Sequence, residues 1–449
     1  MSTLINLVTL IVVRARMAID GVAAVFQIAA AILSATGDGV KAKAATAFQD
    51  PRLQRIALRA LRAFVPNLVL SRQLVGAYPN TGTAIVTRHR DVVEVLDRNA
   101  DFEVVYEPKM RAITGGENFF LGMQDTALYT RDVSNMRLAM RRDDVATIVA
   151  PLARGLAERL LVKPSRRIDV PQDLTLPVPT AIVTDYFGIA NAQAGDLVAW
   201  STLMFWYLFI DLAGDPALAR KVLDAAAACR SAIDAAIAAR KASGEAKDDV
   251  LGRCLVLQKA GLPGMDDLGI RNNLIGLVIG AIPTISKACV QALDQLLERP
   301  QALASAQAAA RAGDDALLAA HVFEAFRFNP INPLIYRRAA RDTRIAAGTL
   351  RARNIPKGCM VLAFNLSAMF DPLRIEAPES FRTDRPWEEY MLWGYGMHTC
   401  FGAYINRAVM PAILKPLLAK PGLRRAAGDA GRIDSGDTPF PRHFAVEWD

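Results

Sequence analysis

The segment from Trp393 to Gly402 constrains this chain more than any other feature of the sequence. It reads Trp-Gly-Tyr-Gly-Met-His-Thr-Cys-Phe-Gly, with three glycines, a histidine and a cysteine. Glycine adopts positive φ without strain and lets the backbone approach a flat, bulky group closely. Gly394, Gly396 and Gly402 therefore predict a tight loop shaped around a ligand.

Cys400 lies in this loop just before a stretch, residues 403–418, whose pattern predicts a helix. A cysteine at a helix N-terminus lies at the positive end of the helix dipole, which lowers its pKa and favours the thiolate. The thiolate is the form that ligates iron. The alternative is a buried loop cysteine that only packs, and it fits poorly with the surrounding glycines and His398.

Composition limits the fold class and the partners. The chain has 449 residues, is 52% hydrophobic and carries a net charge of +8. Its basic residues are scattered, which indicates no nucleic-acid partner and favours a solvated surface or an anionic cofactor. The other four cysteines are expected to be small buried hydrophobic residues; they are Cys229, Cys254, Cys289 and Cys359.

Hydrophobic periodicity predicts a mainly α-helical chain with small, separated sheets. Long helical patterns cover 146–161, 217–243, 268–298 and 316–328. Two patches rich in β-branched residues and bounded by turn signals, 76–95 and 334–361, predict short strands.

The first 39 residues contain two apolar stretches, 4–13 and 21–35, separated by Arg14, Arg16 and Asp20. Neither reaches the roughly 18 uninterrupted apolar residues of a membrane span. One or two helices packed on the protein are one interpretation, and an interfacial helix resting on a membrane is the other. We expect a break at 37–39.

The segment 393–402 resembles the haem-binding loop of cytochrome P450 enzymes, in which an aromatic residue, glycines, a His or Arg and the cysteine recur at fixed spacing. Trp393 stands where Phe is usual. The resemblance implies a mainly α, cytochrome P450-like fold with small β-sheets and a buried haem b. It makes Cys400 the axial metal ligand, with His398, Trp393, Gly394, Gly396 and Gly402 among the cofactor-binding residues.

Glu324 and Arg327 are three residues apart and so share a helix face. A lone pair of this kind is weak evidence, but its position before Cys400 resembles the helix that packs behind the haem in the family. Arg385 resembles the third member of that ion network. If all three are buried, removal of one leaves an unpaired charge, which costs about 3–5 kcal/mol.

Two arginines resemble the family's contacts to the haem propionates. Arg337 begins the run Arg-Arg-Ala-Ala-Arg-Asp, which resembles a propionate-binding strand. Arg137 is the weaker candidate, because Val133 stands at the position where many relatives carry His or Trp.

The segment Gly280-Ala281-Ile282-Pro283-Thr284 resembles the oxygen-binding part of the family's distal helix. The resemblance makes Gly280, Ala281 and Thr284 the catalytic candidates. The acid usual before the threonine is replaced by Pro283, so Thr284 keeps a hydroxyl without an acidic partner for proton relay. Proline inside a helix also predicts a kink near Ala281.

Three functions remain open. The first is a haem-thiolate monooxygenase that uses dioxygen and electrons from a separate ferredoxin or flavoprotein reductase, since the sequence shows no flavin or ferredoxin module. The second is a peroxide-using or peroxide-rearranging haem enzyme, which the loss of the acid at Pro283 favours. The third is a non-catalytic haem-binding protein.

The aromatic run in 200–209 favours an apolar or lipid-like small-molecule substrate, although such a cluster also suits a core. We expect an apolar N-terminal helical segment, residues 1–39, followed by a single P450-like domain over 40–449. The expected location is the cytoplasm, with peripheral membrane contact through the N-terminal segment as the alternative to a helix packed on the protein.

Overall fold

The computed structural model describes the chain apart from residues 1, 37–38, 41–42, 44–46, 48–49 and 191. The fold is mainly helical, as predicted, at 58% helix with small sheets. Two compact units are present: one comprises Met1–Val75, Pro79–Glu103 and Arg327–Met397, and the other comprises Gly76–Tyr78, Val104–Phe326 and His398–Asp449.

The first unit is built on a five-stranded sheet in the order β1-β2-β8-β5-β3. β2 pairs antiparallel with β1, with Asn67 opposite Val86, and parallel with β8. A separate ladder joins β6 and β7. The strands are β1 (Asn67–Leu70), β2 (Thr83–Val86), β3 (Phe102–Glu103), β5 (Ile335–Ala339), β6 (Thr343–Ile345), β7 (Arg353–Ile355) and β8 (Met360–Ala363).

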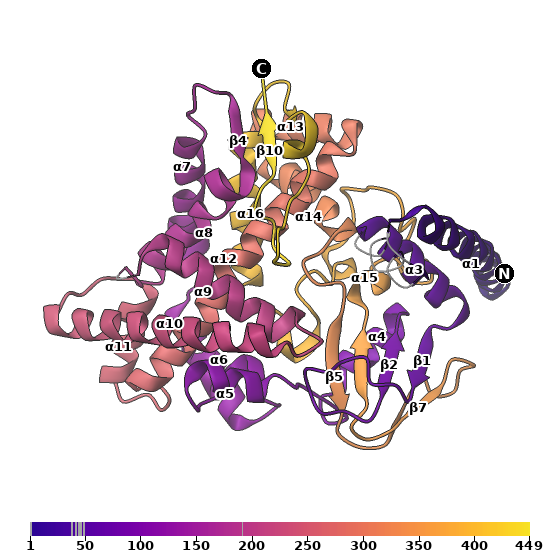
Figure 1. Cartoon of the computed structure of the whole chain (residues 1–449), viewed down its shortest axis with the longest axis horizontal. Coiled ribbons are helices and arrows are strands. Elements are labelled where there is room, and N and C mark those ends of the chain that lie inside the picture. The colour runs from indigo at the N-terminus through magenta and orange to yellow at the C-terminus, as the bar shows by residue number, and fades with distance from the viewer. Residues whose placement is uncertain (1, 37–38, 41–42, 44–46, 48–49, 191) are drawn as a thin grey trace. The chain divides into compact units, whose positions relative to one another are not determined.

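These strands confirm both strand-rich patches, with one difference. Only β2 lies inside the first patch, because its antiparallel partner β1 comes earlier in the chain. Among the described residues four helices complete the unit, and α1 lies beside α3 (Figure 1). They are α1 (Ser2–Ser34), α3 (Pro51–Phe64), α4 (His89–Asp97) and α15 (Asn365–Ala368).

α1 is a single continuous helix, so the charges between the two apolar stretches do not interrupt it. It packs on α3 through a narrow line of residues, Met17, Gly21 and Ala24, at helical spacing. A Cβ on Gly21 would lie 2.6 Å from the Cβ of Ala63, so glycine permits this close approach. Gly37 and Asp38 of the predicted break lie outside the described residues.

The second unit is helical around α12 (Asp267–Leu297), which packs against α9, α10 and α16. Figure 1 shows α12 running among the other helices of this unit. The remaining helices are α5 (Glu107–Thr114), α6 (Ala127–Ala139), α7 (Ala150–Leu160), α8 (Pro177–Ala181), α9 (Ala194–Phe205), α10 (Pro216–Ser243), α11 (Val250–Lys259), α13 (Pro300–Ala312), α14 (Asp315–Phe328, whose last two residues belong to the first unit) and α16 (Ala403–Leu418).

A small antiparallel sheet in the order β4-β10-β9 lies in the same unit, formed by β4 (Arg167–Asp169), β9 (Arg424–Arg425) and β10 (Ala445–Glu447). The four predicted long helices are present. One begins differently: before α7 the chain forms a π-helical turn, Val145–Val149, in which the N–H of Ala150 bonds the carbonyl of Val145. Pro151 follows at once and has no N–H to donate, which favours the wider turn.

Candidate active site

Cys400 precedes α16, whose first residue is Ala403, at the position that the sequence predicts. The pKa of its thiol is raised by burial, not lowered as the helix dipole alone predicts, although the backbone N–H of Gly402, the charge of Arg137 and the backbone N–H of Ala403 act in the opposite direction. The other four cysteines are buried, as expected, but Cys400 keeps partial exposure. A thiol sulfur that faces N–H donors and a guanidinium is suited to bind a metal ion as thiolate.

Of the three glycines around Cys400, two have the positive φ that the sequence predicts. Gly394 and Gly396 have φ of 84° and 71°. A Cβ on Gly396 would lie 3.0 Å from the carbonyl oxygen of Leu96, so glycine is needed there for space as well as for conformation. Gly402 differs: its φ is −86°, and it serves as the residue before the first turn of α16.

Arg137, on α6, is held by the residue after the cysteine. Its Nη1 donates to the carbonyl oxygen of Phe401 at 3.1 Å, and its guanidinium lies 3.9 Å from the centroid of the Phe401 ring. The ring of Tyr404 lies 5.0 Å away. The guanidinium therefore orients the cysteine loop and lends it positive charge, whereas its predicted contact with a propionate stays a prediction.

The catalytic candidates lie together on α12. Gly280 and Thr284 are one turn apart, and the Thr284 hydroxyl donates to the carbonyl oxygen of Gly280. Gly280 is exposed on a helix that is otherwise largely buried, and a Cβ there would meet nothing within 4 Å. Ala281 is 8% exposed. This face of α12 therefore borders open space, and Pro283 leaves the helix continuous.

The three predicted members of the ion network, Glu324, Arg327 and Arg385, are all buried. Arg327 donates to the carbonyl oxygens of Met369 at 3.1 Å and Pro378 at 2.8 Å. Arg385 forms an ion pair with the carboxylate of Glu389 and donates to carbonyl oxygens of the same 376–380 segment.

Arg327 and Arg385 meet at one acceptor, the carbonyl oxygen of Ser380, at 3.4 Å and 2.9 Å. The two guanidiniums thus fix the 376–380 segment through its main chain. The sequence motif contains no signal for these acceptors, because any residue supplies a carbonyl.

The remaining predicted residues lie in both units. Arg337 is 3% exposed on β5, and the indole of Trp393 stacks on Trp387 with ring centroids 5.3 Å apart. In the second unit, the ring of His398 meets the ring of Tyr129 edge-on at 5.2 Å.

Phe401 and Tyr129 are contacts that the sequence argument did not single out. Their signal is positional, because Phe401 follows Cys400 directly and Tyr129 lies on the helix that carries Arg137.

Residues 77–420 match the family model of cytochrome P450. The chain belongs to the cytochrome P450 family. It is therefore an oxidoreductase of the P450 type, and this haem-thiolate family makes haem b its cofactor.

Three similar proteins illustrate the likeness. Erythromycin C-12 hydroxylase of Saccharopolyspora erythraea is 26% identical over 296 residues, which cover 66% of this chain and 69% of that protein. Linoleate diol synthase of Gaeumannomyces graminis is 37% identical over 89 residues, 20% of this chain and only 8% of that much longer protein. The crystal structure of CalO2 shares the fold, with a TM-score of 0.72 and 21% identity over 89% of this chain and 96% of that one.

The residues of the second unit fit a haem. Cys400 supplies a sulfur that faces two main-chain N–H groups, and a cysteine sulfur is the donor that P450 haem iron takes. The open space at Gly280 is the kind of clearance that a planar macrocycle or its ligands need. Cys400 would hold the iron, and His398 of the same unit is the residue that would hold a propionate, whereas the role expected of Arg337 stays a prediction.

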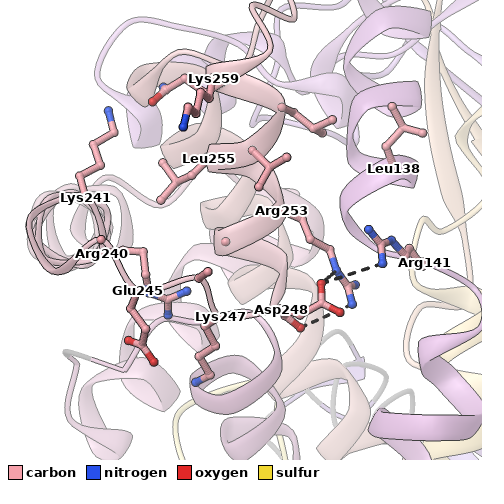
Figure 2. Close-up of a pocket in the computed structure, with 16 residues that line it drawn as sticks. Leu138, Arg141, Arg240, Lys241, Glu245, Lys247, Asp248, Arg253, Leu255 and Lys259 are labelled. Carbon is pink, nitrogen blue, oxygen red and sulfur yellow. Dashed lines mark hydrogen bonds and ion pairs between the residues drawn. The ribbon is translucent and has the colours of Figure 1, made fainter.

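A separate hollow of roughly 560 Å³ lies between the end of α10, the segment after it and α11 (Figure 2). Its charged lining residues are mostly basic, and two of them share one carboxylate: Arg253 pairs with Asp248 at 2.6 Å, and Arg141 lies 3.9 Å from the same oxygen. None of the predicted site residues lines it. We therefore assign the chemistry to the region of Cys400 and Thr284.

Proposed function

We propose that this chain is a monooxygenase that inserts oxygen from dioxygen into an apolar small molecule, with electrons from a separate ferredoxin or flavoprotein reductase. When bound through a thiolate, haem supplies an iron centre that activates oxygen. The name of the erythromycin C-12 hydroxylase relative supports this reaction type.

The observation that carries the proposal is the position of Thr284 on the open face of α12. Its hydroxyl hydrogen is donated to the carbonyl oxygen of Gly280, which leaves the oxygen lone pairs as acceptors. A water in the space beside Gly280 can then donate to Thr284, which orients that water for proton delivery. This arrangement supplies, through solvent, a proton path that Pro283 cannot supply through a side chain.

The test is turnover of an apolar substrate library by haem-loaded protein with surrogate reductase partners and NADPH. Replacing Thr284 with Ala should lower product formed per dioxygen consumed by about tenfold or more, since positioned proton transfer contributes on that scale. T284S should retain coupling. S286A is the matched control, because Ser286 is two residues away and bonds Thr175 at 2.8 Å. Equal coupling in T284A and S286A would contradict the role of Thr284.

The ligand assignment has its own measurement. Haem-loaded protein, reduced and exposed to carbon monoxide, should show the absorbance typical of a thiolate ligand, and C400S should lose it. C289S, a change at a buried cysteine on α12, should keep it. A thiolate spectrum that persists in C400S would sink the assignment of Cys400.

A second candidate is a peroxide-using or peroxide-rearranging enzyme. Two observations favour it: Pro283 stands in place of an acid, and one relative is named linoleate diol synthase. Such an enzyme turns over with hydrogen peroxide or a lipid hydroperoxide and needs no reductase. Peroxides that bleach the haem without product, while the reductase system supports turnover, would remove this candidate.

The reductase needs a docking face, and we propose the exposed arginines near the cysteine loop. Arg142 and Arg407 are exposed, on the segment after α6 and on α16. Basic residues at this location favour an acidic partner. Charge reversal in R142E should raise the reductase concentration needed for half-maximal rate, whereas K259E, a change on α11, should not.

We also propose that the protein is cytoplasmic and attaches to a membrane through α1. The apolar side chains of Val12, Ile19, Phe26 and Leu33 are 59%, 69%, 71% and 76% exposed, although burial would stabilise them. Vesicle flotation should recover the full chain and release a chain that starts at Gly39. Equal flotation of the two chains would contradict this attachment.

A further inference from the structure

Lys287 is the one charged residue of α12 between Asn272 and Leu293. It is three residues after Thr284 and seven after Gly280, so all three share the face of the helix that borders open space. Burial lowers the pKa of its ammonium to about 8. Lys287 is therefore a cation placed inside the second unit, on the same helix face as the proposed oxygen site.

Within the part of the chain that the structure describes, Lys287 has no ion pair and no hydrogen bond. Its contact is with the ring of Phe440, whose centroid lies 5.4 Å from Nζ. The next acid along α12 is Asp294, which is held by Arg425 at 2.6 Å. A charge in this position is costly to desolvate when no anion faces it.

Lys109, which is more completely buried than Lys287, shows how the protein satisfies such a group. Its Nζ donates to main-chain carbonyls and lies 3.4 Å from the Asp211 carboxylate. It also lies 4.3 Å from the ring centroid of Tyr207. Lys109 thus has a carboxylate, carbonyls and an aromatic ring, whereas among the described residues Lys287 has only the ring. The difference identifies a missing anionic partner at Lys287.

The surroundings of Lys287 describe the rest of that partner. Phe440 packs edge-on against Phe205, with ring centroids 5.7 Å apart, and Phe205 packs against Phe209 at 4.8 Å. These rings form an apolar wall next to the cation. A ligand that packs on these rings and pairs with the Lys287 ammonium has an apolar body and a single negative charge.

We propose that Lys287 is a specificity-determining residue that pairs with the carboxylate of an otherwise apolar substrate. The proposal rests on the proposed function, because the substrate would lie on the same face of α12 as Thr284. It narrows the substrate class from apolar small molecules in general to apolar acids, such as fatty acids.

The test measures binding to haem-loaded protein by calorimetry, using dodecanoate and its methyl ester as probes. Dodecanoate should bind at least about tenfold more tightly than the ester, because a charge-assisted pair at a desolvated site is worth that much. K287M, which keeps an apolar chain of similar length, should lose the preference, and K287R should keep it. K259M removes an exposed lysine of α11 and should behave as the unaltered protein.

Two binding results would overturn the proposal: equal or undetectable binding of both probes, or a preference for the acid that survives in K287M. A lower haem content in K287M would also overturn it, because it would assign Lys287 to the cofactor. Calorimetric binding needs no turnover, so it separates the two claims. The acid could bind through Lys287 and yet not be oxygenated with either dioxygen or peroxide. That result would contradict the proposed function but not the proposed binding role of Lys287.

Discussion

Two helices of this protein have nearly the same hydrophobic character and opposite environments. The most apolar windows of α1 and α12 have mean hydropathies of 1.8 and 1.6, and both helices are long enough to cross a membrane. Yet 17% of the α1 window is buried against 89% for α12. Hydropathy therefore shows that a helix favours burial, in protein or in lipid. Only its tertiary contacts decide whether other parts of the protein bury it.

The exceptions on each helix are the informative residues. On exposed α1, the buried residues Met17, Gly21 and Ala24 mark its contact with α3. On buried α12, exposed Gly280 and Lys287, a cation without an ion pair in the described part of the chain, mark the face that a ligand would use. A residue that departs from the environment of its own helix locates an interaction.

The largest expected difference comes from the same carboxylate placed on each helix. I282D should lower the free energy of unfolding by about 4 kcal/mol or more, because Ile282 is fully buried and the charge would have no partner. V22D should change it by less than about 0.5 kcal/mol, since Val22 is 49% exposed. Urea unfolding of haem-loaded protein measures both. Comparable losses in the two variants would show that α1 is buried.

K287M should have a smaller effect on the free energy of unfolding, and the effect should depend on pH. In the folded protein Lys287 loses its proton near pH 8, whereas in the unfolded chain it keeps the proton up to its ordinary pKa of 10.5. The unaltered protein therefore gains stability relative to K287M as the pH rises from about 8 to 10.5. At pH 7 K287M should be the more stable by up to about 3 kcal/mol, and the gap should close by pH 10.5. A pH-independent gap would show that Lys287 is solvated.

The smallest effects are expected from alanine at one glycine of each helix, and they have opposite signs. G21A should destabilise the packing of α1 on α3 by about 1–3 kcal/mol, because the new Cβ overlaps Ala63 and Phe64. G280A meets nothing within 4 Å and should stabilise the protein by about 0.5–1 kcal/mol through helix propensity. Thermal unfolding distinguishes the two, and a stabilising G21A would mean that α1 does not pack closely on α3.

Local patterns in the sequence were enough to predict the elements that depend on them. α16 begins at Ala403 and ends at Leu418, as predicted, and α12 agrees to within a residue at each end, because both follow long apolar runs with clear limits. The cysteine loop was recognisable because its chemistry needs particular residues at particular spacings.

What could not be predicted depends on partners far away in the sequence. The pairing of β2 with β1 and β8 needs segments separated by up to 277 positions. The carbonyl acceptors of Arg327 have no sequence signature, because every residue carries a carbonyl. Lys287 reads as an ordinary surface lysine until the packing around α12 shows what it lacks.

The two N–H groups that face the Cys400 sulfur come from the main chain of Gly402 and Ala403. Every amino acid except proline carries the same donor, so the side chain at position 403 can change over evolution while both donors at the sulfur persist. Selection can therefore change side chains near the cysteine for new substrates or partners while the two main-chain donors at its sulfur are kept.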